Sequence, residues 1–340
     1  MVDISCLKCD ELPNRKKIDG IDEKILRTLL KESRTSFTEI AKDCKISVNS
    51  VRKRYMRLRK AGIINGAIMQ VNPTSLGYKC IATISVATAI EDESSVIEFL
   101  KSKPYCREVF RNIFARANIA TVISLHEFEE LSKTIQDIEA NPKIKYTKAF
   151  IWNKTSGIDQ PKNLMLNPSS NKTNNKQDPK LNKTKHEKVE LDKTDRQIAK
   201  ILSQDSRTPF TKIAEKINIS TKNVIQRYKK LRRTVLTNST ITVSLEKLGY
   251  NAAVLLLIKV TNRSQTSETV SKLLQIPNLI IVLEYVGGEY DLFVSIVLRD
   301  YEDLFKLKEH INAIKNLQEL EMFMGRPYPA WPLNLFASLF

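Results

Sequence analysis

The second half of this chain repeats the first half at an offset of 173 residues (206 minus 33 for the matching serines). The clearest copy is Ser33-Arg34-Thr35, which returns as Ser206-Arg207-Thr208. After one deletion, Leu76-Gly77-Tyr78 returns as Leu248-Gly249-Tyr250. Register held over this length indicates a tandem duplication, so each half is expected to form the same elements in the same order.

Residues 47–60 have the pattern of a basic amphipathic helix. Val51, Tyr55 and Leu58 fall on one face at helical spacing, and no acidic residue interrupts the polar face. Ser47 stands at the N-cap position, where its hydroxyl can accept an amide of the first turn. A lysine- and arginine-rich face is usually just a solvated surface, so the neighbouring segments decide how this helix is interpreted.

Two shorter helices are expected before it, over residues 22–32 and 38–43, and three helices with this spacing predict a helix-turn-helix. Residues 61–71 follow, with Gly62 as a helix stop and Asn65-Gly66 between two short apolar runs. An Asn-Gly pair in that setting predicts a β-hairpin. We therefore expect a winged helix-turn-helix whose recognition helix is the basic one.

Beyond the hairpin, the expected order is strand, helix, two strands, helix, strand. Residues 80–88, for example, alternate and are rich in β-branched side chains, as strands are. The order predicts a ferredoxin-like unit, in which a four-stranded antiparallel sheet carries two helices on one face. The other face is apolar and needs a cover, so a partner sheet is implied. The fold class expected is α+β, with two winged helix-turn-helix domains each followed by a βαββαβ domain.

Composition marks the boundaries of these domains. Asparagine, lysine, serine and proline dominate the middle of the chain, which predicts a disordered linker there. The C-terminal residues are irregular and apolar, so we expect them to pack on a neighbouring domain or subunit. The expected segments are an N-terminal tail (1–17), a first winged helix-turn-helix (18–72), a first βαββαβ domain (73–153), the linker (154–188), a second winged helix-turn-helix (189–244), a second βαββαβ domain (245–325) and a C-terminal tail (326–340).

The net charge of the chain is +17. This bias predicts an anionic partner such as nucleic acid, although charge alone does not exclude a membrane surface or mere solubility. The longest unbroken apolar run, residues 252–258, has the length of a strand, so no membrane span is expected. Because the first residues do not resemble a signal peptide, we expect a cytoplasmic, nucleoid-associated protein.

The chain has five cysteines, an odd number that does not suggest a disulfide framework. Cys6 and Cys9 have the spacing of half a zinc site. The other half is not visible, because Cys44, Cys80 and Cys106 are scattered through expected helices and strands. The favoured interpretation is a tail without metal, with an intermolecular metal site or redox pair as the alternative, and no cofactor is expected.

Several motifs occur in a shared order over nearly the whole chain outside the linker and tails. They are residues 18–22 with Ile25-Leu26, residues 34–41, residues 46–54, residues 61–66, Asn72-Pro73 with Leu76-Gly77-Tyr78, and residues 287–291. On these motifs each half resembles a member of the Lrp/AsnC family, the feast/famine transcription regulators. The resemblance implies a winged helix-turn-helix followed by a ligand-sensing RAM domain. It also implies that RAM domains pair sheet to sheet and that amino acids or similar molecules bind between dimers.

The glycine-acid turn at residues 287–291 is the candidate ligand site. The resemblance implies that Gly287 and Gly288 let a ligand approach the backbone, and that Glu289 and Asp291 can receive an ammonium group. The register counterpart in the first half, residues 114–118, has lost both glycines and both acids. We therefore expect no amino-acid site there, and an ordinary hairpin with solvated acids is the alternative for the second turn.

On the two recognition helices, arginine and lysine are expected to grip phosphates, whereas residues early on each helix can reach base edges. Tyr55 and Tyr228 are in phase with core positions, so we expect them in the core. The residues expected to contact DNA are Asn49, Ser50, Arg52, Lys53, Arg54 and Arg57 in the first half, and Lys222, Asn223, Gln226, Arg227 and Lys230 in the second.

Three functions are compatible with this pattern. The first is a sequence-specific transcription regulator on double-stranded DNA that responds to an amino acid or other small molecule. The second is an architectural DNA-binding protein of low sequence specificity. The third is an enzyme, because some proteins similar to this family are sirohaem decarboxylases. Only His126, His186 and His310 are available as histidine acid-base groups, so we expect no enzyme.

The repeat also bears on assembly. Two RAM domains in one chain are expected to pair with each other as two subunits would. A homodimer formed through these domains would then imitate a four-subunit assembly of single-module relatives.

Overall fold

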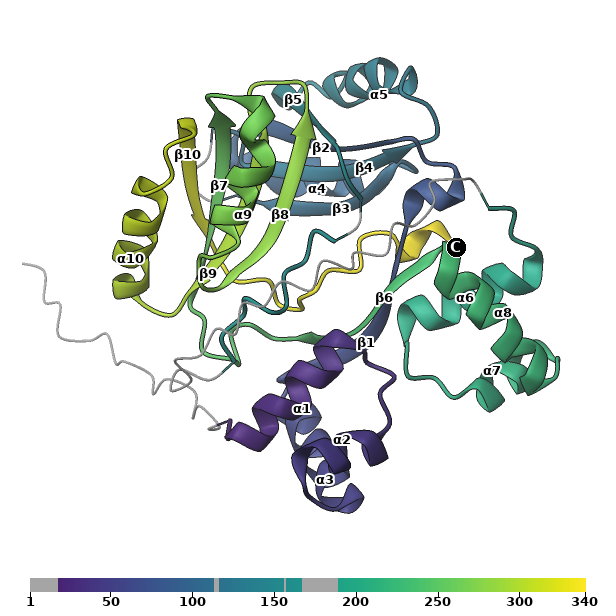
Figure 1. The fold of residues 1–340 in the computed structure, drawn as a ribbon. Helices are drawn as coiled ribbons and strands as arrows, with labels where there is room; N and C mark the ends of the chain where they lie inside the picture. The colour runs from purple at the N-terminus through teal and green to yellow at the C-terminus, as the bar shows by residue number, and fades with distance from the viewer. Residues whose placement is uncertain (1–17, 113–115, 156, 167–188) are drawn as a thin grey trace, which may run out of the picture.

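The computed structural model describes residues 18–112, 116–155, 157–166 and 189–340. Two bundles of three helices lie below a large β-sheet assembly, and a two-stranded ribbon runs up from them (Figure 1). Cys6, Cys9 and His186 lie outside the described residues. None of the described helices is long and apolar enough to cross a membrane.

The two bundles repeat the same three elements. The first consists of α1 (Gly20–Lys31), α2 (Phe37–Cys44) and α3 (Val48–Lys60), and the second of α6 (Lys193–Gln204), α7 (Phe210–Ile217) and α8 (Thr221–Thr234). In the first bundle, Asp19, Ser36 and Ser47 each cap the start of a helix through a side-chain oxygen. Lys45 ends α2 in the left-handed region, with φ of 55°, so the turn to α3 is tight.

Each bundle is followed by one strand, β1 (Ile64–Val71) or β6 (Leu236–Val243), and these two strands pair antiparallel with each other. The predicted hairpin after α3 is therefore wrong, because Asn65 and Gly66 lie within a continuous strand. A hairpin inside this segment would have two very short arms, which are marginal in isolation. Pairing with the other half gives the whole strand a partner instead.

Two βαββαβ units follow the two strands. The first contains β2 (Cys80–Thr88), α4 (Glu93–Lys101), β3 (Cys106–Arg111), β4 (Ile119–Leu125), α5 (Glu130–Glu139) and β5 (Ile144–Trp152). The second contains β7 (Ala252–Val260), α9 (Thr266–Leu273), β8 (Leu279–Val286), β9 (Leu292–Leu298), α10 (Tyr301–Asn312) and β10 (Leu317–Gly325). The strands form one antiparallel sheet in the order β10-β7-β9-β8-β5-β2-β4-β3. Within each unit the last strand lies beside the first, the first beside the third and the third beside the second, which is the ferredoxin-like order.

Both faces of each unit are covered. Helices α4 and α5 cover one face of the first unit, and α9 and α10 cover one face of the second. On the opposite faces, Phe150 and Trp152 of the first unit share a core with Tyr285 and Tyr290 of the second. The rings of Phe150 and Tyr285 stack with their centroids 5.2 Å apart. The cover that the apolar faces require therefore comes from within the chain, in line with the expected intramolecular pairing.

The C-terminal residues pack against the ribbon and α6. Trp331 is fully buried, and its backbone pairs with that of Val243 in β6. The Asn334 amide donates to the backbone oxygen of Ser203 at 2.7 Å. The tail thus fills the space between the sheets and the second bundle (Figure 1).

The prediction of disorder throughout the linker is wrong for residues 157–166. The N–H of Gln160 donates to the backbone oxygen of Ile280 in β8 at 2.8 Å, and Leu164 and Leu166 are buried. A few apolar side chains among polar neighbours supply this burial, and average composition conceals them. Most of the remaining predicted linker lies outside the described residues.

Candidate nucleic-acid interface

The helices α3 and α8 turn the same positions inward. These positions are Val51, Tyr55 and Leu58 in α3, and their counterparts Val224, Tyr228 and Leu231 in α8. Both tyrosines belong to the core of their bundle, as the sequence predicted. The opposite face of each helix is therefore left for contacts with another molecule.

A buried carboxylate ties α3 to the start of its bundle. The side chain of Asp22 in α1 is 1% exposed, and it accepts from the guanidinium groups of Arg54, at 2.9 Å, and of Arg57. Arg54 also donates to Asp19 at 2.6 Å. Two charge-assisted contacts to one buried acid fix the orientation of the helix more firmly than neutral hydrogen bonds would.

The second bundle contains the same tie. Arg227 in α8 donates to Asp192 at 2.6 Å and to the buried Asp195 at 2.7 Å. Lys230 donates to Asp195 at 3.0 Å. Lys230 therefore occupies the position that Arg57 holds in the first bundle. Its ammonium group is a single point of charge, whereas the guanidinium of Arg57 is a planar fork.

The pKa values of the capping acids follow from these contacts. Burial opposes the ionised form of Asp19, but hydrogen bonds from the Asp22 N–H and from Arg54 leave its pKa below the ordinary value. In the second bundle, the hydrogen bond from the Asp195 N–H is the main cause that lowers the pKa of Asp192. Both acids are therefore ionised at neutral pH, and each sits at a helix N-terminus that favours negative charge.

Four predicted DNA contacts thus have intramolecular partners: Arg54, Arg57, Arg227 and Lys230. The signal for this was present in the sequence, because two aspartates recur at the same offset as the arginines they bind. Sequence reasoning missed the tie because it treated every basic residue on the helix as available to DNA.

The outer face of each helix carries the other predicted residues. Asn49, Arg52 and Lys53 in α3 are exposed, as are Lys222 and Gln226 in α8. Among the described residues, Arg52, Lys53 and Lys222 make no ion pair. Cations without a partner on an exposed helix can neutralise phosphate charge.

Two of the residues predicted to contact DNA make hydrogen bonds within their own helix segments. The Ser50 hydroxyl shares a 2.9 Å hydrogen bond with Ser47, the N-cap of α3. The Asn223 side-chain oxygen accepts from Arg227 at 3.0 Å, so this asparagine also helps to hold the tie. Their remaining hydrogen-bonding groups are available at the first turn of each helix.

An approximate two-fold axis relates the two bundles. In the β1–β6 ribbon, Ile68 pairs with Thr240, its counterpart after the one-residue deletion. The hydroxyl of Ser33 lies 2.6 Å from that of Ser206, again its counterpart. Residues meet their own counterparts only on a two-fold axis, so α3 and α8 are presented by a rotation of this kind.

Two arginines cross the axis in opposite directions. Arg34 of the first bundle lies over the ring of Phe210 in the second, 4.1 Å from its centroid. Arg207 lies over the ring of Phe37 in return, at 4.8 Å. Each guanidinium also donates to two backbone oxygens of the opposite bundle. The repeated Ser-Arg-Thr sequence is therefore a joint between the bundles.

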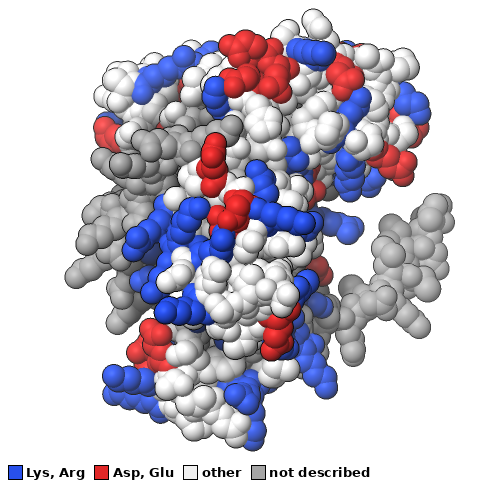
Figure 2. Space-filling view, turned by 90° about the vertical axis from the view of Figure 1, so that its right-hand side faces the viewer, with Lys and Arg blue, Asp and Glu red and all other residues white. Residues whose placement is uncertain are grey.

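The surface charge is unevenly distributed. Figure 2 shows the side on which the second bundle lies, and Lys and Arg side chains gather over its lower half, where the helical bundles are. The largest acidic group in this view lies at the top, over the sheet assembly. Basic side chains also occur over the upper half in this view, so the basic surface includes the helical bundles without being confined to them.

The predicted ligand turn joins β8 to β9, and both of its acids are already paired. Glu289 pairs with Lys148 of the first βαββαβ unit, and this contact lowers the pKa of Glu289. Asp291, which is buried, accepts from the N–H of Val260 at 2.9 Å and from Arg263 at 2.7 Å.

The first half uses an amide for the same task. The side-chain oxygen of Asn118 accepts from the N–H of Thr88, at the end of β2, at 3.0 Å. Asp291 makes the equivalent contact at the end of β7, so this position has a structural role in both halves. Gly287 and Gly288 have φ of 71° and 87°, a region that favours glycine, so the turn itself requires them. The ligand role of the turn stays a prediction.

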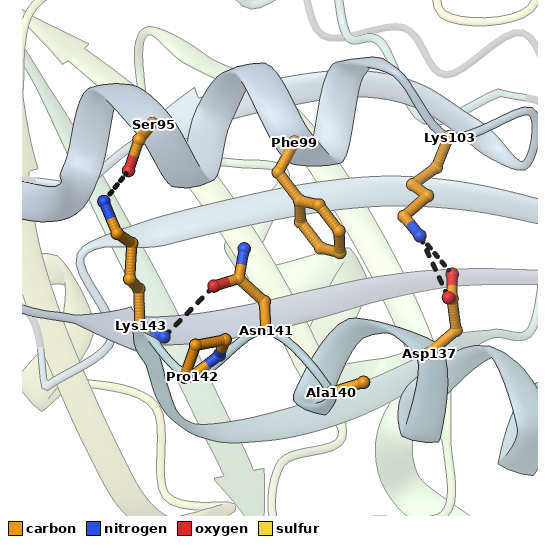
Figure 3. A pocket seen from close by; sticks show the side chains of 8 residues that line it. All are labelled: Ser95, Phe99, Lys103, Asp137, Ala140, Asn141, Pro142 and Lys143. Carbon is orange, nitrogen blue, oxygen red and sulfur yellow. Dashed lines mark hydrogen bonds and ion pairs between the residues drawn. The ribbon is translucent and has the colours of Figure 1, made fainter.

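A shallow, solvent-open hollow of about 510 Å³ lies elsewhere, between α4 and the end of α5 (Figure 3). Phe99 points into it, and Lys103 pairs with Asp137 at one end at 2.8 Å. At the other end Lys143 donates to Ser95 at 3.0 Å. Its lining contains neither histidine nor cysteine and none of the predicted ligand residues.

The two described histidines lie on different βαββαβ units. His126 is exposed and stacks on Tyr78, with ring centroids 4.2 Å apart. His310 is exposed in α10, where its ring lies 2.7 Å from the backbone oxygen of Lys306. They do not converge on a common site.

Known families match both bundles. Residues 18–65 match a model of a winged helix-turn-helix DNA-binding domain, and residues 191–232 match the AsnC-type helix-turn-helix domain. The HTH-type transcriptional regulator LrpA of Pyrococcus horikoshii is 43% identical over 93 residues, which is 27% of this chain and 66% of LrpA, just under two thirds of its length. The HTH-type transcriptional regulator FL11 of Pyrococcus furiosus is 32% identical over 129 residues, which is 38% of this chain and 84% of FL11. The chain belongs to the Lrp/AsnC family.

A solved structure extends the likeness to the rest of this Lrp/AsnC chain. The siroheme decarboxylase NirDL has a similar fold over 93% of this chain and 96% of its own, with a TM-score of 0.63. The sequence identity is 15%, so this likeness concerns the fold alone.

Proposed function

We propose that this protein is a sequence-specific, DNA-binding transcription regulator that presents two recognition helices to one duplex. The observation that carries the proposal is the two-fold relation between α3 and α8. Helix-turn-helix proteins that read DNA place two recognition helices about one turn of the duplex apart by such an axis. The exposed cations on the outer faces of both helices support it.

In this proposal the predicted residues take two roles. Asn49, Ser50 and Arg52 reach base edges in one half, and Lys222, Asn223 and Gln226 do so in the other, while Lys53 contacts phosphate. Arg54 and Arg227 chiefly position their helices through the buried aspartates. Arg57 and Lys230 are half exposed and serve both purposes.

A competition experiment tests this proposal. The full chain is titrated with its best genomic fragment and with scrambled DNA at physiological salt and at two other salt concentrations. A regulator prefers the fragment by two or more decades. The variant Arg52→Ala should weaken binding about tenfold and reduce the salt slope, whereas Lys306→Ala in α10 serves as a matched control without effect. Equal affinity for both DNAs would support the architectural alternative, which the similarity to named regulators does not favour.

The duplication, the assembly and the effector belong to the same proposal. We attribute the two halves to duplication of one helix-turn-helix and RAM module. We also propose that two chains form a homodimer and that the protein is located at the nucleoid.

An amino acid at residues 287–291 would have to displace Lys148 from Glu289 to place its ammonium there. Amino acids that raise the melting temperature of the wild type but not of Glu289→Gln would support this site.

We propose no catalytic role, although an enzyme shares the fold. The two described histidines are exposed and lie on separate units. Titration of the protein with sirohaem should leave the absorption spectrum of the tetrapyrrole unchanged. A shifted spectrum together with loss of a carboxylate as carbon dioxide would contradict this part of the proposal.

A further inference from the structure

The two recognition helices agree where they hold the bundle and differ where they face outward. The inward residues are valine, tyrosine and leucine in both helices, and the arginine of the tie is kept. Four outward positions on the first two turns all differ, and in order along the helices the counterparts are Asn49 and Lys222, Ser50 and Asn223, Arg52 and Ile225, and Lys53 and Gln226. The difference is therefore confined to the face that would meet the bases.

The β1–β6 ribbon and the contacts between the two bundles leave α3 and α8 little freedom to move relative to each other. The β1–β6 ribbon spans both strands from end to end, and the crossed Arg34 and Arg207 clamp the bundles on either side of it. Ser33 adds contacts to Ser206 and Ser239 at the centre. Both helices are thus presented at one fixed spacing, in one fixed order.

We infer that a single chain reads an asymmetric DNA site, made of two unlike half-sites in a fixed order and at a fixed spacing. This inference rests on the proposed function and specifies its substrate. Two identical helices on a two-fold axis read a palindrome, because the axis of the protein coincides with that of the DNA. Two unlike helices on the same axis keep the geometry but lose the palindrome, so the site acquires a direction.

The side chains indicate the bases on each side. The α3 half presents Arg52, and arginine matches the two acceptors of guanine in the major groove. The α8 half presents Gln226, whose amide matches adenine, and Ile225, whose apolar surface suits the thymine methyl group. The expected site therefore has a G·C pair opposite Arg52 in its α3 half and A·T pairs opposite Ile225 and Gln226 in its α8 half.

The experiment is selection of bound duplexes from a randomised pool by the wild type and by two exchange variants. The first variant gives α8 the outward residues of α3 through Lys222→Asn, Asn223→Ser, Ile225→Arg and Gln226→Lys. The second gives α3 those of α8 through Asn49→Lys, Ser50→Asn, Arg52→Ile and Lys53→Gln. Both leave the inward residues and the aspartate–cation pairs unchanged, and Asn223→Ser removes only the added contact to Arg227. Circular dichroism confirms that each variant is folded.

The wild type should enrich a non-palindromic site, and the two variants should enrich two different palindromes built from its halves. Inverting one half-site, or inserting five base pairs between the halves, should reduce wild-type affinity at least tenfold. A wild-type palindrome, or enrichment of one half-site alone, would overturn the asymmetric site while leaving the regulator in place. No enrichment of any sequence would overturn both the inference and the proposed function. The selection with the wild type tests the asymmetric site without any variant, so the inference stays testable even if an exchange variant does not fold.

Discussion

In α3 and α8 the inward positions hold the same residue types, whereas the outward positions of the first two turns all differ. The contacts to the buried aspartates are partly conserved between the halves. The acid and one arginine are kept, and the second cation changes from Arg57 to Lys230. Residues that a fold needs are thus retained between the halves, and residues that only another molecule would contact have diverged. The comparison separates stability from recognition within one chain.

Removing the arginine of each tie should have the largest effect on stability. Arg54→Ala leaves the buried Asp22 with one cation, and Arg227→Ala does the same to Asp195. Each should lower the free energy of unfolding by about 3 kcal/mol, with the larger loss in the second bundle because Lys230 is a weaker partner. Urea denaturation without DNA measures this.

The matched controls are Lys53→Ala and Gln226→Ala, which should leave the unfolding curve unchanged. Unfolding curves of Arg54→Ala and Arg227→Ala that coincide with the wild type would show that these arginines are held for DNA alone.

A second comparison concerns Asp159, which lies in the segment between the two halves and contacts both of them. Gln70 in β1 donates to the Asp159 carboxylate at 2.6 Å. The backbone of Asp159 pairs with that of Ile281 in β8. Burial raises the pKa of Asp159 to about 7, against the smaller opposing effect of the Gln70 hydrogen bond. The folded state therefore retains a proton that the unfolded chain loses near pH 4, and stability should fall as pH rises from about 4 to 7.

Asp159→Asn should abolish that dependence and raise stability at pH 8 by roughly 2 kcal/mol relative to the wild type. Thermal unfolding at pH 5 and pH 8 measures the difference, and the exposed Glu289→Gln is the control. An equal gain at both pH values would mean that the carboxyl is not protonated in the folded protein.

The crossed arginines allow the symmetry itself to be tested. Arg34→Ala and Arg207→Ala should each cost about 1 kcal/mol, because each removes one cation–π contact and backbone hydrogen bonds. A double-mutant cycle should show coupling between them, since both hold the same joint. Strictly additive losses would indicate two independent contacts.

Asp291→Asn should have the smallest effect. Asn118 already accepts the equivalent backbone N–H in the first half, so an amide suffices for that contact. The lost partner, Arg263, is largely exposed although Asp291 itself is buried, and we expect a change of less than about 0.5 kcal/mol. A loss of several times that size would show that the carboxylate charge is required at this turn.

The sequence predicted the elements well because their signals are local. Ser47 as a cap, Val51 and Leu58 as core positions and the β-branched run of β2 each report on their own neighbourhood. The hairpin failed because a local Asn-Gly signal competed with a distant partner, β6, that no local pattern reveals.

The site was harder to predict than the fold. An exposed and a paired arginine look alike on a helical projection, so Arg52 and Arg54 could not be told apart from their spacing alone. The tie depends on Asp22, which lies 32 residues earlier in the chain than Arg54. The crossing of Arg34 to Phe210 depends on how two folded bundles meet, which propensity does not encode.

The β1–β6 ribbon has a consequence for how the protein responds to its own abundance. A pair of recognition helices assembled from two separate polypeptides forms by mass action. Its concentration therefore falls with the square of the monomer concentration when the protein is scarce. In the proposed function both recognition helices belong to one chain, so the second is always present at a high effective concentration around the first. Occupancy of a site can then follow gene dosage linearly, even at a few copies per cell.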